Sequence, residues 1–414
     1  MELSSKEHFK AYVGIDWADK KHDICLQPAD SNSREFTNIL HTAEAIDEWA
    51  KKLHKRFKGP IAVAVELSKG PIVYALQKYD FIVVFPIDPT KLARYRVAFK
   101  PSRAKDDPTD AEFALDLMCR YPDKFKPLRQ QGSEVRKLMY LVEQRRKFVD
   151  DKRRFSNRLI NTLKQYYPQI LDWFAHRDTL LFCNFIIRWP SLQKIKRSRE
   201  STIVDFFHAN NGRSRVRIEQ CLKATKESMP LTHDQAILCS HQLQAIALAE
   251  QIIATIKAIR LFDDEIASTF KQRPDANLFD TLPGSGPCLA PRLLVAFGEQ
   301  RDRYKNAREV QQYAGIAPVT ERSGKKEWIH WRWQCSKFLR QTFVEWAAKT
   351  IDKSYWAGIY YQRQRDKGNS HQVAVRALAF KWIRILFRCW KSSTPYNEVT
   401  YLNSLKQRGS PLMV

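Results

Sequence analysis

The sequence has no apolar run that approaches the roughly 20 residues needed to cross a bilayer, so a membrane span is not expected. Its N-terminus, MELSSKEHFK, is polar and lacks the apolar core of a signal peptide. The eight cysteines are scattered and form no CxxC pair, which in a chain of this size predicts reduced thiols rather than a disulfide framework. Together these absences predict a cytoplasmic protein.

Acidic residues are scarce relative to basic ones. The 45 Asp and Glu residues face 70 Lys and Arg residues, which gives a formal net charge of +25. Such an excess indicates a polyanionic partner, and nucleic acid is the commonest one. A ribosomal or membrane-surface protein is the alternative, although the length and the aromatic content of 12% weigh against a ribosomal protein. With 414 residues, 44% of them hydrophobic, the chain can form two or three domains with their own cores.

The first 130 residues alternate between strand and helix patterns. Apolar spacing predicts a helix at 42–57, with Thr42 as its N-cap, and further helices at 72–79 and 89–99. Strands are predicted at 11–18, 22–29, 34–40, 60–67 and 81–87. Three hairpin-like strands followed by a helix, a strand and a helix form a mixed sheet. We therefore predict an α/β RNase-H-like (RuvC-like) catalytic domain over residues 1–130.

The middle of the chain contains two long helical patterns, at 133–165 and 232–271. Helices of this length can pair, so residues 131–275 are predicted to form a helical coiled-coil linker. Between the two helices, residues 166–230 are aromatic, basic and less regular. We expect surface loops within that insertion, at 195–200 and 210–217.

A mostly α-helical C-terminal domain is predicted over residues 276–390. Its segment PGSGP (283–287) is similar to the hairpin of a helix-hairpin-helix motif, in which glycine turns offer backbone N–H groups to phosphate. A simple helix start is the alternative explanation. Residues 391–414 are polar and are expected to form a loose tail.

Four acidic residues lie at positions where they can converge. Asp16 ends the first predicted strand and Glu66 ends the fourth, while Asp107 and Asp110 fall in the first turn of a helix that begins at KDDPTDAEFAL. Four converging carboxylates repel one another without cations, but they suit two Mg²⁺ or Mn²⁺ ions. The alternative is structural: the helix acids could interact with the helix dipole, and Asp106 could be the N-cap.

These segments also resemble a known family. GIDWADKKHDICL, VAVELSKGPIVYAL and KDDPTDAEFAL are similar to the three blocks of the DEDD transposases, the Piv/MooV-type insertion-sequence transposases and bridge-RNA-guided recombinases. LPGSGPCLAPRLLVAFGEQRDRYKNAREVQQYAGIAPVTERSG resembles the second conserved region of that family, so the similarity covers roughly 1–120 and 276–350. The four family acids fall on Asp16, Glu66, Asp107 and Asp110, because the pattern K-x-D-x-x-D-A selects Asp107 rather than Asp106.

The resemblance implies a nucleophile and partners. A serine in an SG element of this family attacks DNA phosphate and forms a phosphoserine, and here that residue is Ser323. A serine hydroxyl needs a base, a metal or cationic surroundings, which Arg322, Lys325 and Lys326 supply. The family also implies double-stranded donor and target DNA, a structured guide RNA and a dimer or tetramer, and hence a nucleoid-associated location. From the residues alone, an ordinary Ser-Gly turn is the simpler explanation.

Two further segments are candidates for nucleic-acid contacts. In WIHWRW (328–333), Trp328 and His330 alternate with Ile329, so one face could stack on bases. A tryptophan-filled core strand is an equal alternative for this segment. A basic run leads toward the acids and is expected to guide phosphates rather than to form only a solvated helix face. It comprises Lys91, Arg94, Arg96, Lys100, Arg103 and Lys105.

Three other functions remain open at this point. A RuvC-like structure-specific endonuclease would use water as the nucleophile on the same four acids. A sugar-kinase-like phosphotransferase would share the first strand, acid and hairpin, but no later glycine-rich phosphate loop is present and the net charge of +25 does not suit it. A non-catalytic nucleic-acid-binding descendant would not be expected to keep all four acids and the serine.

Overall fold

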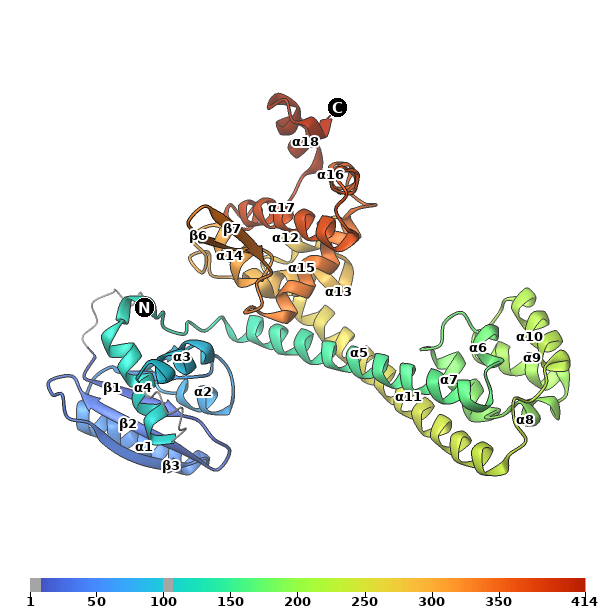
Figure 1. The fold of residues 1–414 in the computed structure, drawn as a ribbon, viewed down its shortest axis with the longest axis horizontal. Coiled ribbons are helices and arrows are strands. Elements are labelled where there is room, and N and C mark those ends of the chain that lie inside the picture. Colours follow the sequence, from blue (N-terminus) through green and yellow to red (C-terminus); the bar gives the residue numbers. More distant parts are fainter. Residues whose placement is uncertain (1–8, 100–106, 414) are drawn as a thin grey trace. The chain divides into compact units, whose positions relative to one another are not determined.

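The computed structural model describes residues 9–99 and 107–413, without the side chains of Asp107 and Met413. The chain divides into two units, residues 1–130 and residues 131–414 (Figure 1). All eight cysteines are free. Among the described residues, no helix combines the length and the apolar character that a bilayer span requires.

The N-terminal unit contains a five-stranded mixed sheet, and each of its strands lies where the sequence predicts one. The strand order is β3-β2-β1-β4-β5, with β1 parallel to β4, β4 parallel to β5 and the other pairs antiparallel. This mixed α/β arrangement confirms the coarse fold class. The strands are β1 (Ala11–Asp16), β2 (Lys21–Pro28), β3 (Glu35–Leu40), β4 (Ile61–Val65) and β5 (Ile82–Pro86).

Helices cover both faces of this sheet. Helices α1 (Ala43–Phe57) and α2 (Pro71–Leu76) pack against Val13, Ile15 and Val63 on one face. Helices α3 (Pro89–Phe99) and α4 (Asp107–Arg120) pack against Ala62, Ala64 and Phe85 on the other. The hydroxyl of Thr42 accepts a hydrogen bond from the Ala45 N–H, as predicted for an N-cap. A 3₁₀ turn, η1 (Pro122–Lys124), follows α4.

Two long helices, α5 (Ser133–Tyr166) and α11 (Gln235–Lys271), pack against each other and confirm the predicted pair. Salt bridges join their surfaces, with Lys137 Nζ 2.5 Å from Glu265 Oε1 and the Arg145 guanidinium on the Asp263 carboxylate. One end of each helix contributes to the core of the C-terminal helices, and the other end contributes to a separate core formed with residues 170–227.

Residues 166–230 form a helical module, so the expectation of an irregular segment was wrong. Its core is aromatic and includes Phe182, Phe185 and Trp189. The expected loops at 195–200 and 210–217 lie partly in helices. The pattern was missed because helices of 4 to 13 residues are too short to show a clear period. They are α6 (Ile170–Trp173), α7 (Leu180–Arg188), α8 (Leu192–Lys196), α9 (Glu200–Ala209) and α10 (Arg215–Glu227).

The C-terminal part of the second unit is mostly helical, as predicted, with one two-stranded hairpin. Its core contains four fully buried tryptophans, Trp346, Trp356, Trp382 and Trp390. The helices are α12 (Ala276–Asp280), α13 (Gly286–Phe297), α14 (Ala307–Tyr313), α15 (Lys337–Thr350), α16 (Tyr355–Asp366), α17 (His371–Lys391) and α18 (Glu398–Gln407). The hairpin strands are β6 (Val319–Ser323) and β7 (Lys326–His330).

The tail beyond Lys391 is not loose. It forms α18 and a 3₁₀ turn, η2 (Pro411–Met413), which bury Leu405 and Leu412 against the tryptophan core. Glu398 accepts hydrogen bonds from the Ser354 hydroxyl and the Tyr355 N–H. The polar composition of the tail gave no indication of these two apolar contacts.

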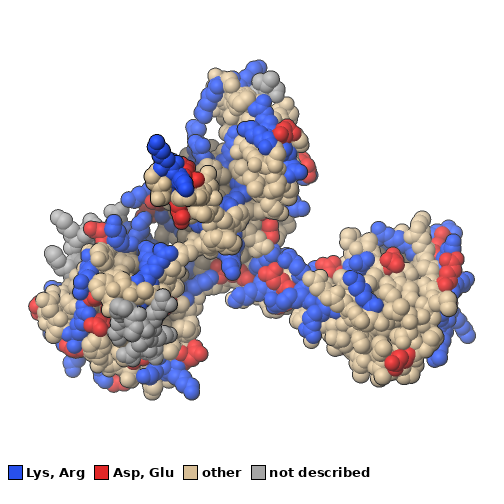
Figure 2. All heavy atoms as spheres, in the orientation of Figure 1, with Lys and Arg blue, Asp and Glu red and all other residues tan. Residues whose placement is uncertain are grey.

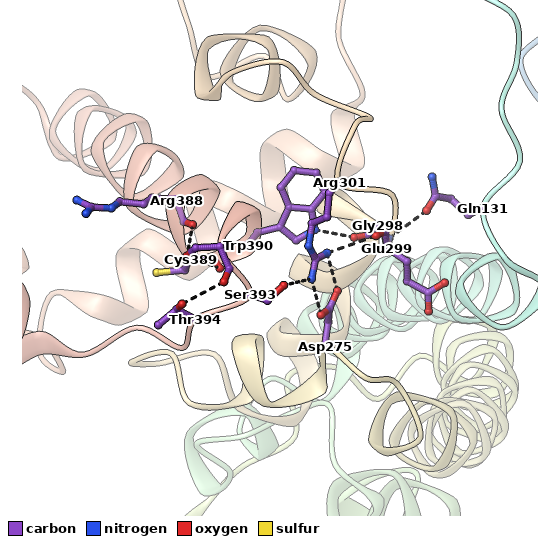
Figure 3. Close-up of polar contacts among 11 residues, drawn as sticks. Gln131, Asp275, Gly298, Glu299, Arg301, Arg388, Cys389, Trp390, Ser393 and Thr394 are labelled. Carbon is purple, nitrogen blue, oxygen red and sulfur yellow. Dashed lines mark hydrogen bonds and ion pairs between the residues drawn. The ribbon is translucent and has the colours of Figure 1, made fainter. Parts of the chain in front are cut away.

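Arg301 ties three segments of the C-terminal core together (Figure 3). Its guanidinium donates to both carboxylate oxygens of Asp275, at 2.7 and 2.6 Å, and to the Ser393 hydroxyl at 3.1 Å. It also lies over the ring of Trp390, whose indole N–H donates to the Gly298 carbonyl at 2.7 Å. These contacts fix the loop after α13 against the start of α12 and the end of α17.

The PGSGP turn between α12 and α13 is used within the fold. The Trp346 indole donates to the Pro283 carbonyl at 3.0 Å. A Cβ added at Gly284, where φ is +70°, would lie 2.7 Å from the Lys349 carbonyl oxygen. Gly284 therefore permits the close packing of this turn against α15.

Candidate active site

The ends of β1 and β4 bring two of the predicted acids to the same edge of the sheet. Ile15 of β1 is paired with Val65 of β4 in parallel register. The next residues along the two strands are Asp16 and Glu66, and both are half-buried. Since parallel strands end at the same edge, the register alone sets these two acids side by side.

Strand alternation directs both acids toward α4. Tyr12, Gly14 and Asp16 alternate along β1 with Val13 and Ile15, and the latter two belong to the core on the α1 side. In β4, Ala62 and Ala64 belong to the core on the α4 side. Because successive side chains point to opposite faces, Asp16 and, one residue beyond the strand, Glu66 fall on the α4 face.

Gly14 lets α4 approach β1 more closely than any side chain would allow. A Cβ at Gly14 would lie 1.9 Å from the Ala111 carbonyl oxygen and 2.8 Å from the Leu115 N atom. Tyr12, farther from the end of β1, packs near the later residue Cys119. Helix α4 therefore runs antiparallel to β1, and its first turn, which contains Asp110, lies toward the end of β1 that carries Asp16.

Asp110 is buried and ion-paired. Its side chain is only 2% exposed, and Arg96 of α3 donates to both of its oxygens, from Nε to Oδ1 at 2.6 Å and from Nη2 to Oδ2 at 2.5 Å. The interaction is bidentate, the geometry in which a guanidinium binds a carboxylate most strongly. Arg96, which the sequence predicts to contact nucleic acid, is paired with a predicted site acid in this structure.

Several predicted residues lie at the edge of the described region. Asp107 is the first residue of α4, which agrees with its predicted place in the first helical turn, but its side chain is outside the described part. Lys100, Arg103 and Lys105 lie outside the described residues altogether, as does Asp106.

A second ion-pair network holds α4 on the sheet. Arg34, between β2 and β3, donates from Nη1 to Glu112 Oε1 at 2.6 Å and from Nη2 to Asp116. Asp116 is buried and is also approached by Arg120 at 3.3 Å. Glu112 and Asp116 lie one helical turn apart, so one arginine binds two successive turns of α4.

One acid at this edge escaped the sequence analysis. Asp23 of β2 is paired directly with Asp16 of β1 and is 7% exposed. Directly opposed residues of an antiparallel pair share a face, so Asp23 lies on the α4 face beside Asp16. Lys21 approaches it at 3.8 Å. The sequence feature that could have identified Asp23 is the presence of an acid within the largely apolar segment HDICL.

The acids at this edge are the candidates for binding a divalent metal. Among the described side chains, no group of three His, Cys, Asp or Glu residues is close enough to hold a metal ion, and Asp107 is not among those side chains. Asp16, Glu66 and Asp110 nevertheless offer carboxylate oxygens, the ligands that Mg²⁺ and Mn²⁺ prefer. Arg96 donates to both oxygens of Asp110, so a metal at this carboxylate would have to share it with the guanidinium or displace the guanidinium.

Ser323 lies at the tip of the β6–β7 hairpin, drawn in orange in Figure 1. It is paired with Lys326 across a two-residue turn formed by Gly324 and Lys325. Gly324 has φ of +57°, and a Cβ there would meet nothing within 4 Å. The serine is exposed, and the exposed residue opposite it on the same face is a lysine. A strand lies on each side of the turn.

The remaining predicted contact residues are exposed cations. Lys91 and Arg94 are exposed on α3, and Lys91 Nζ lies 5.7 Å from the ring centroid of Phe125. Lys325 and Lys326 are exposed at the hairpin tip, whereas Arg322 is paired with Glu327 at 2.9 Å. Figure 2 shows Lys and Arg side chains distributed over both units, with Asp and Glu among them.

The WIHWRW segment is not a core strand. Trp328, Ile329, Trp331 and Trp333 are all exposed, so the core interpretation was wrong. Trp331 anchors the base of the hairpin, because the Arg376 guanidinium carbon lies 3.5 Å from its ring centroid. Arg376 also donates to the carbonyl oxygens of Gly315, at 3.3 Å, and Ile316, at 3.1 Å.

Comparison with known proteins gives a consistent family assignment. Residues 13–168 match the profile of the DEDD transposase of IS110, and residues 276–362 match the profile described as transposase IS116/IS110/IS902 family. The first match spans the sheet, α4 and α5. The second spans α12 to the middle of α16 and includes the Ser323 hairpin.

Relatives align along nearly the whole chain. The mini-circle protein of IS117 from Streptomyces coelicolor, named as a candidate transposase, is 26% identical over 95% of this chain and 97% of its own length. A 44.8 kDa protein of insertion element IS116 from Streptomyces clavuligerus is 23% identical, with 96% and 99% covered. A 42 kDa protein of IS900 from Mycobacterium paratuberculosis is 22% identical, with 94% and 98% covered.

Proposed function

The chain belongs to the IS116/IS110/IS902 family of transposases, enzymes that cleave and rejoin DNA, and from this premise we propose that it moves an insertion sequence by strand transfer through Ser323. The proposal has two chemical parts. The first is a carboxylate site on an RNase-H-like (RuvC-like) sheet, and the second is a serine nucleophile on a separate unit.

The observation that supports the proposal is the position of three backbone elements, the ends of β1 and β4 and the first turn of α4, toward one edge of the sheet. The Ile15–Val65 register sets Asp16 beside Glu66, and the Gly14 contact brings the first turn of α4 toward the same edge. Asp107 and Asp110 belong to that first turn. We therefore propose Asp16, Glu66, Asp107 and Asp110 as the catalytic, metal-binding set, with Mg²⁺ or Mn²⁺ as the metal.

A bound divalent metal would supply positive charge to the phosphate oxygens that carry charge in the transition state. The chain's own residues do the rest. The carboxylates would hold the metal at the sheet edge, and the phosphate would be attracted there only through that bound charge. Lys326, opposite Ser323, stabilises the negative charge of the phosphate, and Lys325 and Arg322 hold the same group from the turn and from β6.

Serine chemistry explains how a strand is both cut and rejoined without an external energy source. Ser323 Oγ attacks phosphorus, the bond from phosphorus to the leaving deoxyribose oxygen breaks, and the serine proton is lost as the leaving oxygen gains one. One phosphoester replaces another, so the bond energy is kept. In rejoining, a hydroxyl of the recipient strand attacks the phosphoserine and Ser323 regains its proton.

The proposed partners are inferred from the net charge of the chain and from its family. A chain with a net charge of +25 suits a polyanion, and we propose double-stranded donor and target DNA together with a structured guide RNA. The proposed phosphate contacts in the first unit are Lys91, Arg94, Arg96, Lys100, Arg103 and Lys105. Arg96 would take this role only when it leaves Asp110. We further propose that the protein acts as a dimer or tetramer.

The test is a denaturing gel after incubation with Mg²⁺, the flanking DNA of the element and its RNA. A covalent protein–DNA band is expected for the natural sequence. The band should disappear in Ser323→Ala and in Asp16→Asn, and it should remain in Thr320→Ala, a control that removes an exposed hydroxyl from the same hairpin.

The contrary outcome is informative. If DNA cleavage without an adduct persists in Ser323→Ala but is lost in Asp16→Asn, water is the nucleophile and the protein acts as a RuvC-like nuclease. If cleavage persists in both variants, the proposed site is not the site of the reaction.

A further inference from the structure

The β6–β7 hairpin displays more apolar surface than its own stability requires. Trp328 is 45% exposed and Ile329 is 70% exposed. A two-stranded hairpin gains stability by packing its apolar side chains, yet these two side chains face solvent. Large exposed apolar residues gathered on one small element mark a surface that binds something.

Trp328 shares a face with Ser323. Directly opposed residues of the hairpin are Ser323 with Lys326 and Glu321 with Trp328, and opposed residues lie on the same face. Trp328 is two residues from Lys326 along β7, a separation of about 7 Å. Ile329, opposite Thr320, lies on the other face. The Trp328 indole is thus the aromatic group on the same face of the hairpin as Ser323.

The charge around this face is suited to a polyanion. Residues 319–340 contain six Lys and Arg residues and two Glu residues. Glu327 is paired with Arg322 at 2.9 Å, and Glu321 lies 3.3 Å from His330. Among the described side chains, neither Lys325 nor Lys326 is paired with a carboxylate. A second copy of this hairpin would bring the same cationic surface and would be repelled.

We infer that Trp328 is a stacking platform for the unpaired base of the DNA nucleotide next to the phosphate that Ser323 attacks. This inference rests on the proposed function, because it takes Ser323 as the reacting group. Exposed aromatic rings interleaved with cations are the usual means of binding single-stranded nucleic acid. In a duplex both faces of a base are covered by its neighbours, so only an unstacked base can contact the indole.

The inference gives the lysines and the indole of the hairpin different roles. Lys325 and Lys326 contact the phosphate backbone and carry most of the salt dependence of binding. Trp328 contacts the base and is tolerant of sequence, since every base has a π-face. The stacked base would hold the adjacent phosphate at a fixed distance from the serine, on the same face of the hairpin.

The experiment measures binding of the full chain to an end-labelled, mixed-sequence single-stranded DNA oligonucleotide by fluorescence anisotropy. Trp328→Ala should weaken binding about 5- to 150-fold, which corresponds to roughly 1–3 kcal/mol. Trp328→Phe should restore most of the affinity. Binding of a blunt duplex of the same sequence should not change, and neither should the slope of log K against log salt.

Ile329→Ala is the matched control, because it truncates the exposed neighbour on the opposite face. An equal loss in Ile329→Ala would show that the hairpin fold, not stacking, is being measured, and would overturn the inference. A loss for an RNA oligonucleotide alone would overturn the assignment of DNA as the occupant. Unchanged circular dichroism in all variants verifies that the chain is folded.

Ser323→Ala separates this inference from the proposed function. If Ser323→Ala still cleaves and rejoins DNA while Trp328→Ala loses single-stranded binding, the nucleophile is wrong and the stacking site stands as a binding site. If Ser323→Ala abolishes the adduct while Trp328→Ala binds like the natural sequence, the stacking inference fails and the proposed function stands.

Discussion

Arg96 and Asp110 form a two-point ion pair between α3 and α4, with donor–acceptor distances of 2.6 and 2.5 Å. The Asp110 side chain is 2% exposed and the Arg96 side chain is 20% exposed. A carboxylate removed from water to this extent requires a cation, and Arg96 is the cation that the structure supplies.

Removing Arg96 should therefore destabilise the N-terminal unit. We expect Arg96→Ala to lower its free energy of unfolding by about 3–5 kcal/mol, because Asp110 is left buried with no partner. Arg96→Lys should recover only part of the loss, since an ammonium group cannot form the bidentate contact. The measurement is hydrogen exchange of the α4 amides in the two variants and in the natural chain.

The effect of a divalent metal on hydrogen exchange is a second test of the Arg96–Asp110 pair. If the carboxylates bind metal, Mn²⁺ should protect the α4 amides of Arg96→Ala more than those of the natural chain, because the metal takes over the charge of the missing guanidinium. Asp110→Asn in the Arg96→Ala background should remove that protection. Equal Mn²⁺ effects in all three proteins would contradict a role for Asp110 in metal binding.

Gly14→Ala should separate α4 from the sheet. The added Cβ would lie 1.9 Å from the Ala111 carbonyl oxygen, and neither backbone can yield without moving the helix. We expect a loss of about 3 kcal/mol in the free energy of unfolding, at the high end for overpacking. Thermal unfolding checks this result. Gly59→Ala is the control, because its Cβ would meet only the flexible Lys10 side chain, and a similar loss there would contradict the argument.

Sequence patterns predicted the sheet well because each strand is long enough to show an apolar or alternating residue pattern that is typical of strands. The end of the first strand at Asp16, the end of the fourth strand to within one residue of Glu66, the Thr42 cap and the place of Asp107 in the first turn of α4 all followed from local residue order. Local order also indicated that acids gather at one edge, since the carboxyl ends of parallel strands share that edge.

What could not be predicted depends on packing between elements. No local signal shows that Arg96 turns inward to Asp110 rather than outward to a phosphate, because this depends on how α3 packs against α4. The sequence also could not predict that Trp328 is exposed, because the same alternation of residues fits a core strand. The module around Phe185 was missed because its helices are short and its aromatic core forms only when they fold together.

The Arg376–Trp331 contact should control how firmly the hairpin is held. Arg376→Ala removes the nearer of two guanidinium groups over the indole, since Arg340 remains 5.1 Å from the ring centroid, and it leaves the Gly315 and Ile316 carbonyls without these donors. We expect a loss of about 2 kcal/mol, confined to the hairpin and its base. Limited proteolysis across residues 315–333 should accelerate, while cleavage in the N-terminal unit should not. Uniform acceleration in both units would indicate general unfolding instead.

His22 should make the stability of the N-terminal unit depend on pH. Its ring is fully buried in β2; Nδ1 accepts from the Ala18 N–H at 3.3 Å, so Nε2 donates to His41 Nδ1 at 2.9 Å. Burial, and to a lesser extent the neighbouring His41, lowers the pKa of His22 to about 4 from its ordinary value of 6.5. The folded state thus favours the neutral ring, and protonation at Nδ1 would break the contact with the turn that follows Asp16.

The sign follows from proton counting. Between pH 6.5 and 4 the unfolded chain binds a proton at His22 that the folded chain does not, so stability rises with pH in this window. The contribution is complete above about pH 6.5, and its loss on acidification reaches roughly 3 kcal/mol near pH 4. Urea unfolding at pH 7 and pH 5 measures it. His22→Gln should flatten this part of the pH profile, whereas an unchanged slope in that variant would assign the acid sensitivity to other groups.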